Sequence, residues 1–119
     1  MRRAGLDYWH LVDVRTHENF DAFERTLPHA PDEPAPRLWL FSGRSQKSYL
    51  DVRYRPGDVF VFGKESLGLP AALLDARRET ALAIPLLGDV RSHNLANAVA
   101  IVLYEALRQT GALRELDYR

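Results

Sequence analysis

The residues that could do chemistry lie in three loops, and each loop directly follows a short apolar run. These loops begin at Ser42, at Gly63 and at Leu86. The second loop reads Gly-Lys-Glu-Ser-Leu-Gly-Leu-Pro, and its glycines allow a close approach of the backbone to a ligand, although glycine pairs after strands are often only turns. The chain has no cysteine and only four scattered histidines, which excludes a cysteine nucleophile and thiolate metal sites and leaves no histidine metal-ligand spacing. The sequence alone therefore leaves these loops as candidate ligand-binding segments.

The elements that position these loops are apolar runs that alternate with helical patterns. Strands are expected at His10–Val14, Arg37–Phe41, Val59–Phe62 and Thr80–Leu86, and helices at Asn19–Leu27, Ala71–Ala76 and Asn94–Gln109. Apolar strands separated by helices predict an α/β fold, in which a parallel sheet carries helices on both faces. Ligands of such sheets bind beyond the carboxyl ends of the strands, where the three loops would lie.

The helix expected from Asn94 to Gln109 has the strongest pattern in the chain. Ser92 or Asn94 can cap this helix at its N-terminus. One face of the helix should be buried, whereas its C-terminal end, with Glu105, Arg108 and Gln109, should be exposed to solvent. The predicted buried face consists of Leu95, Ala98, Val99, Val102, Leu103, Ala106 and Leu107. Further apolar residues, including Tyr104, make the helix apolar nearly all round. A homodimer whose interface includes Tyr104 is therefore expected.

Composition narrows the class of protein. The 119 residues are enough for one domain with a single core. With 16 basic and 16 acidic side chains, the chain has no global positive field, so any nucleic-acid binding must rest on local patches. No apolar run approaches the roughly 20 residues needed to cross a bilayer, and no signal peptide is evident. A cytoplasmic protein without membrane or metal partners is expected.

Two segments together carry a resemblance. VFVFGKESLGLP, followed by AIPLLGDVRSHNLANAVAIVLYEALRQ, resembles the last two motifs of the trefoil-knot (SPOUT) RNA methyltransferases. The opening RRAGLDYW is similar to the branch that methylates the ribose 2′-OH of the tRNA wobble nucleotide, cytidine or uridine. The resemblance covers essentially the whole chain as one domain. It implies a C-terminal trefoil knot, S-adenosylmethionine as cofactor, tRNA as substrate and pairing of two subunits through the knot.

The resemblance also implies site residues. The methyl donor would be held at Phe41, Gly63, Ile84, Leu86, Leu87 and Ser92. For Phe41, Ile84 and Leu87 plain core packing is the alternative, and Ser92 could simply cap the following helix. Glu65 occupies a position that the family usually fills with Glu, but it could equally form an ion pair or cap a turn.

The arginines of the loops are the expected RNA contacts, through phosphate charges. The set is Arg2, Arg3, Arg44 and Arg91, with Lys47, Arg53 and Arg55 as further members. Solvated surface arginine is the alternative.

The chain also departs from the family pattern. Relatives begin with a strand, a helix bearing an Arg and a second strand before the segment that matches Met1, and that Arg is the proposed activator of the 2′-OH. The catalytic residue is therefore unknown in this chain, and this form is expected to be nearly inactive and poorly stable. Two functions stay open: a tRNA ribose 2′-O-methyltransferase, or a non-catalytic knotted domain that binds RNA or mediates dimerisation.

Overall fold

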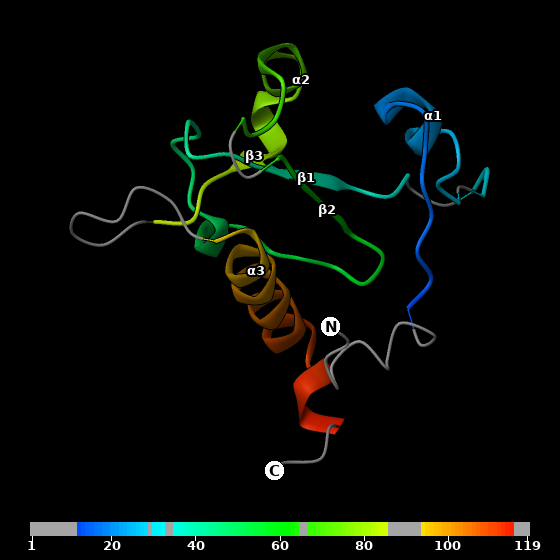
Figure 1. The fold of residues 1–119 in the computed structure, drawn as a ribbon. Coiled ribbons are helices and arrows are strands. Elements are labelled where there is room, and N and C mark those ends of the chain that lie inside the picture. The colour runs from blue at the N-terminus through cyan, green and yellow to red at the C-terminus, as the bar shows by residue number, and fades with distance from the viewer. Residues whose placement is uncertain (1–11, 29, 33–34, 65–66, 86–93, 116–119) are drawn as a thin grey trace, which may run out of the picture. The chain divides into compact units, whose positions relative to one another are not determined.

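The chain divides into two compact units, residues 1–35 and 36–119, which are described separately (Figure 1). The structure is a computed structural model, and it describes residues 12–28, 30–32, 35–64, 67–85 and 94–115. Residues 86–93, on which the expected knot depends, and residues 1–11 lie outside these ranges.

Over its described residues, the first unit contains one short helix, α1 (Phe20–Glu24). The Asn19 side chain caps it by accepting a hydrogen bond from the Ala22 N–H at 2.8 Å. The helix expected to continue to Leu27 stops at Glu24, because the Thr26 and Leu27 N–H groups turn back to Phe23 and Glu24 and Pro28 disfavours helical backbone at the residue before it. The strand expected at His10–Val14 is absent over its described part, residues 12–14.

The second unit is built on a three-stranded parallel sheet of order β2-β1-β3. Its strands are β1 (Leu38–Phe41), β2 (Val59–Phe62) and β3 (Ala81–Leu82). All of β1 is buried, as expected for a central strand with both faces covered. The predicted parallel α/β arrangement is therefore confirmed.

The two faces of the sheet carry different helices (Figure 1). Trp39, Phe41 and Leu82 form one core cluster with Val102 and Ala106 of α3 (Leu95–Thr110). Because side chains alternate along a strand, Leu38 and Leu40 point to the opposite face. On that side lies α2 (Ala71–Ala76), whose bounds agree with the prediction.

The expected fourth strand, Thr80–Leu86, is much shorter than predicted. Thr80 lies in a 3₁₀ turn, η3 (Arg78–Thr80), and β3 ends at Leu82. Beyond it, Ala83 donates to the carbonyl of Lys47 and accepts from the N–H of Tyr49. The chain after β3 therefore pairs with the segment leaving β1 instead of with β1 itself.

Helix α3 is rotated relative to its predicted orientation. Asn94 caps it, and Gly111 ends it in the left-handed conformation, with φ of 81°. Val99 and Leu103, predicted to be buried, are exposed, whereas Gln109 is partly buried. The Gln109 side chain accepts from the Tyr54 N–H at 2.8 Å and donates to the Val52 carbonyl at 3.0 Å. These bonds attach the end of α3 to the segment after η2 (Tyr49–Asp51).

A turn between η2 and β2 is held by one carboxylate. Asp58 accepts from the Arg37 Nε at 3.1 Å, the Arg37 Nη2 at 2.8 Å, the Trp39 indole N–H at 2.9 Å and the Arg55 N–H at 2.9 Å. Gly57, with φ of 91°, completes the turn that the sequence predicts at residues 55–58. The last described element is a 3₁₀ turn, η4 (Ala112–Glu115).

Candidate functional site

Three of the residues expected to hold the methyl donor follow the carboxyl ends of the three strands. Phe41 ends β1 and pairs with Phe62 on one side and with Leu82 on the other. Gly63 follows Phe62 directly, and Ile84 lies two residues after Leu82. Since parallel strands end at the same edge of a sheet, these three positions converge there, which is the usual location of ligands in this fold class.

The side chains of Phe41 and Ile84 also belong to the core. Phe41 stacks on Phe62 with ring centroids 4.8 Å apart, and Ile84 packs against the same core cluster while half-buried. The Phe41 side chain is therefore part of the core, so this position could contact a ligand mainly through its backbone. Among these three described residues, the partly exposed Ile84 offers a side-chain surface to a ligand.

The loop after β2 is built on a close approach of two backbone segments. A Cβ on Gly63 would lie 2.1 Å from the carbonyl carbon of Gly68 and 2.3 Å from the Leu69 nitrogen. The Gly68 N–H donates to the Lys64 carbonyl at 2.7 Å, and Gly68 has φ of 68°. Beside this loop lies a largely apolar pocket of about 400 Å³, lined by Phe62, Gly63, Lys64, Leu67, Gly68, Leu69 and Pro70.

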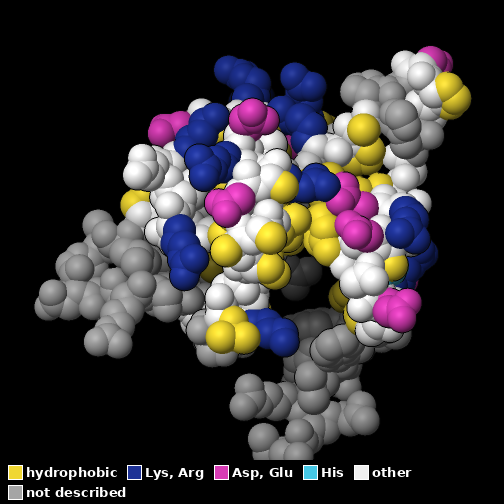
Figure 2. All heavy atoms as spheres, turned by 90° about the horizontal axis from the view of Figure 1, so that it is seen from above, with side chains coloured by type: hydrophobic (Ala, Val, Ile, Leu, Met, Phe, Trp, Pro, Cys, Tyr) yellow, Lys and Arg dark blue, Asp and Glu magenta, His cyan; other side chains and the backbone are white. Residues whose placement is uncertain are grey.

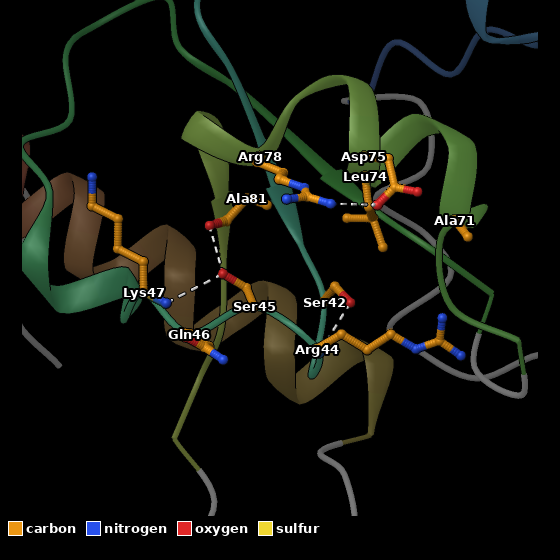
Figure 3. A pocket seen from close by; sticks show the side chains of 10 residues that line it. All are labelled: Ser42, Arg44, Ser45, Gln46, Lys47, Ala71, Leu74, Asp75, Arg78 and Ala81. Atoms are coloured by element: carbon orange, nitrogen blue, oxygen red, sulfur yellow. Dashed lines mark hydrogen bonds and ion pairs between the residues drawn. The ribbon is translucent and has the colours of Figure 1, made fainter.

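A second pocket, of about 610 Å³, lies between the loop after β1 and the segment from α2 to β3 (Figure 3). Its lining includes three cationic residues, Arg44, Lys47 and Arg78, and one carboxylate, Asp75. The remaining lining residues are Ser42, Ser45, Gln46, Ala71, Leu74 and Ala81.

Residues 1–104 match the model of the SpoU rRNA Methylase family. The chain belongs to this family. A tRNA (cytidine(34)-2′-O)-methyltransferase of Burkholderia ambifaria is 45% identical, over 93% of this chain and 69% of its own length. The Escherichia coli tRNA (cytidine(34)-2′-O)-methyltransferase is 41% identical, over 93% of this chain and 68% of its own length.

The chain is shorter than the SpoU relatives it matches. A Lactobacillus gasseri relative is 45% identical over 93% of the chain, which spans 59% of that relative. A solved structure described as "Structural insights into the 2-OH methylation of C/U34 on tRNA" superposes with a TM-score of 0.77 and 47% identity, over 91% of this chain and 63% of that one. A solved structure from Bacillus anthracis superposes with a TM-score of 0.79 and 31% sequence identity. The match covers 98% of this chain and 70% of that one.

Several expected site residues of this SpoU chain fall outside the described residues. These are Arg2, Arg3, Leu86, Leu87, Arg91 and Ser92, together with Glu65. Of the expected RNA contacts, Arg44 is exposed at the rim of the second pocket, with Lys47 beside it. Tyr104, the expected interface residue, is 60% exposed on α3.

Three ionisable groups with displaced pKa values lie in the scaffold of the second unit. Burial opposes ionisation of Asp58, but the hydrogen bonds from Arg37, Trp39 and the Arg55 N–H prevail and lower its pKa. Burial, with the nearby Glu105 charge, raises the pKa of Tyr54 well above its usual range. Hydrogen bonds from Arg108 and Gln109 lower the pKa of Glu105. These groups hold the core and α3 together.

Arg78 is the pocket residue that sequence reasoning missed as a ligand contact. In the sequence, Arg78 lies just before the expected strand Thr80–Leu86 and more than thirty residues after the loop that follows β1. The available signal was the Arg77-Arg78 pair directly before β3, and the register that pairs Ala81 with Leu40 brings the start of β3 near the end of β1.

The described residues contain no group of three or more His, Asp or Glu side chains placed to hold a metal ion. In the same part of the chain, no helix combines the length and apolar character needed to span a membrane.

Proposed function

We propose that this chain forms the S-adenosylmethionine-binding part of a methyltransferase that acts on the ribose 2′-OH of the tRNA wobble nucleotide. The observation that carries the proposal is the convergence of Phe41, Gly63 and Ile84 at the carboxyl edge of the sheet, in a chain of the SpoU family. The relatives named for methylation at cytidine 34 of tRNA support the choice of substrate. Action on tRNA implies a cytoplasmic protein.

The described residues at this edge fit the methyl donor. The pocket beside Gly63 is largely apolar, and the partly exposed Ile84, which does not line that pocket, presents an aliphatic surface at the same edge of the sheet. Such surfaces suit adenine, whose faces are covered by aliphatic side chains while backbone groups read its edge. S-Adenosylmethionine would supply the activated methyl group. By resemblance, Leu86, Leu87 and Ser92 complete the donor site, and the segment that contains them forms the trefoil knot of a single SPOUT domain spanning residues 1–119.

Calorimetry with S-adenosylhomocysteine tests the donor site. The chain is expected to bind S-adenosylhomocysteine and to bind guanosine far more weakly. Ile84→Ala should weaken binding several-fold, because it removes part of the aliphatic surface, whereas Leu50→Ala, at a side chain of η2 that is 53% exposed and lines neither pocket, should have little effect. Thermal melting of each variant checks that the fold is retained.

Transfer of labelled methyl groups to unmodified tRNA tests the reaction. Transfer by this chain alone is expected to be slow, and any label should appear in the 2′-O-methylated wobble nucleotide after digestion of the tRNA. RNA binding without any binding of S-adenosylhomocysteine would reject the methyltransferase and favour the non-catalytic RNA-binding domain.

We also propose a homodimer that uses the exposed apolar face of α3. Val99, Leu103 and Tyr104 are 39%, 42% and 60% exposed, and they lie within two turns of one helix. An apolar face of this kind on a small unit is a typical subunit interface.

Tyr104→Glu is expected to convert the dimer into a monomer, because it would place a charge in the apolar interface. Light scattering across micromolar concentrations should give twice the chain mass for the parent and one chain mass for the variant. Thr110→Glu, an exposed change near the end of the same helix, is the control and should remain dimeric. A parent protein with the mass of one chain would contradict the dimer.

A further inference from the structure

We infer that the pocket between the loop after β1 and the segment from α2 to β3 binds a phosphate of the RNA backbone. Arg44, Lys47 and Arg78 would neutralise the phosphate charge. This inference rests on the proposed function and adds a specific contact site for the RNA substrate.

The charge of the lining favours an anion. Three cationic side chains and one carboxylate line the pocket, which leaves an excess of two positive charges. Among the described residues, neither the Arg44 nor the Lys47 side chain has an ion-pair partner. Arg78 has only a loose one, since its Nη2 lies 3.6 Å from the Asp75 carboxylate and both side chains are largely exposed. Within the described part of the chain, all three cations can therefore engage a ligand.

The loop that carries Arg44 and Lys47 is held in place by its own hydrogen bonds (Figure 3). The Ser45 hydroxyl donates to the Ala81 carbonyl at 2.7 Å and accepts from the Lys47 N–H at 3.3 Å. The Ser42 hydroxyl accepts from the Arg44 N–H at 3.2 Å. The Lys47 carbonyl accepts from the Ala83 N–H at 2.8 Å. The backbone is thus ordered before binding, so binding loses entropy mainly in the long side chains.

The position of the pocket suits a nucleotide next to the reacting one. Ser42, which lines the pocket, directly follows Phe41 of the proposed donor site, and Ala81 begins β3 on the adjacent strand. In the view onto α2, several Lys and Arg side chains lie on the surface with Asp and Glu side chains between them (Figure 2).

The lining also indicates which part of the RNA is bound. The described lining residues include no aromatic side chain on which a base could stack, and their apolar members are the small or aliphatic Ala71, Leu74 and Ala81. Recognition here would depend on charge and would be insensitive to base sequence, as is usual for phosphate contacts.

Fluorescence anisotropy with a labelled anticodon stem-loop RNA, at several salt concentrations, tests the site. The variant Arg44→Gln, Lys47→Gln, Arg78→Gln is expected to bind at least about tenfold more weakly at low salt. The slope of log K against log salt should become shallower by about 0.7 for each phosphate of single-stranded RNA that the variant no longer neutralises. Asp75→Asn should bind a few-fold more tightly, because it removes the opposing charge.

Arg114→Gln provides the matched control, since Arg114 is an exposed arginine in η4, beyond α3 on the other face of the sheet. It should leave both the affinity and the salt dependence unchanged. A triple variant that behaves like Arg114→Gln would overturn the phosphate site. Competition by inorganic phosphate or ATP as strong as competition by unlabelled RNA would also overturn it, in favour of a site for a free anion.

Binding of S-adenosylhomocysteine, measured in parallel, separates this inference from the proposed function. The triple variant should bind S-adenosylhomocysteine like the parent. If the parent binds S-adenosylhomocysteine and RNA but the triple variant retains full RNA affinity, only the phosphate site is rejected. If the parent binds neither ligand, the proposed function fails as well.

Discussion

Replacing Gly63 with alanine is expected to lower the free energy of unfolding by about 3 kcal/mol, the upper part of the usual range for overpacking. The added Cβ would lie 2.1 Å from the Gly68 carbonyl carbon and 2.5 Å from its oxygen. Both obstacles are backbone atoms, so no side-chain rotation can relieve the overlap. The loop must separate from β2, and the hydrogen bond between the Gly68 N–H and the Lys64 carbonyl would be strained.

Gly43→Ala is the matched control, because it makes the same change in the loop after the neighbouring strand. No heavy atom lies within 4 Å of a Cβ at Gly43. Urea unfolding followed by circular dichroism should show little change for this variant and a large shift for Gly63→Ala. Equal midpoints for the two variants would show that the loop after β2 has room for a side chain.

This geometry changes how Gly63 can be used to test the donor site. The sequence suggests that a larger residue here would simply block the cofactor. In the structure, even the first carbon of any side chain meets the backbone of the same loop. Lost binding in Gly63→Val would therefore report damage to the loop, whereas Ile84→Ala tests the ligand surface itself.

Asp58→Asn is expected to cost about 2–3 kcal/mol of unfolding free energy, the range typical of hydrogen bonds to charged groups and of breaking a largely buried ion pair. The Asp58 side chain is only 5% exposed, and its two oxygens accept four hydrogen bonds. The amide group of asparagine has only one acceptor oxygen. Even with that oxygen in the position that accepts three of the bonds, the Arg37 Nε would face the amide NH2 group and lose its acceptor. The 30% exposure of Arg37 keeps the cost below that of a fully buried pair.

Asp75→Asn is the control for the same chemical change at an exposed site. Its ion pair with Arg78 is long, at 3.6 Å, and both side chains are at least 70% exposed. Urea unfolding at neutral pH should therefore show a change of less than about 0.5 kcal/mol for Asp75→Asn. A loss at Asp58 no larger than this control would contradict the structural role of the carboxylate.

The pH dependence of stability follows from the lowered pKa of Asp58. Because the pKa is lower in the folded state than in the unfolded state, the stabilisation is fully present above the unfolded value of about 3.9. It is lost as the pH falls through the folded pKa. The difference in unfolding free energy between the parent and Asp58→Asn should therefore be largest at neutral pH and shrink at pH values below about 4.

The sequence by itself determined the local elements and the class of fold. Continuous apolar runs placed β1 and β2 within one residue of their observed bounds, and Pro70 placed the start of α2. The turn at residues 55–58 could also be predicted from the sequence, as could Asn94 as one of two possible helix caps. Both depend on only a few adjacent residues. The motifs that resemble the SPOUT family were readable for the same reason.

Only the tertiary structure decided which surfaces meet. Periodicity placed Val99 and Leu103 on the buried face of α3, but Gln109 binds the backbone at Val52 and Tyr54, and this fixes a different rotation. β3 is short because Ala83 forms its backbone hydrogen bonds with Lys47 and Tyr49, in the segment after β1, instead of with β1 itself. Arg78 joins Arg44 and Lys47 around one pocket for the same reason. Contacts between residues more than thirty positions apart depend on how the strands are ordered, and local sequence patterns carry no information about that order.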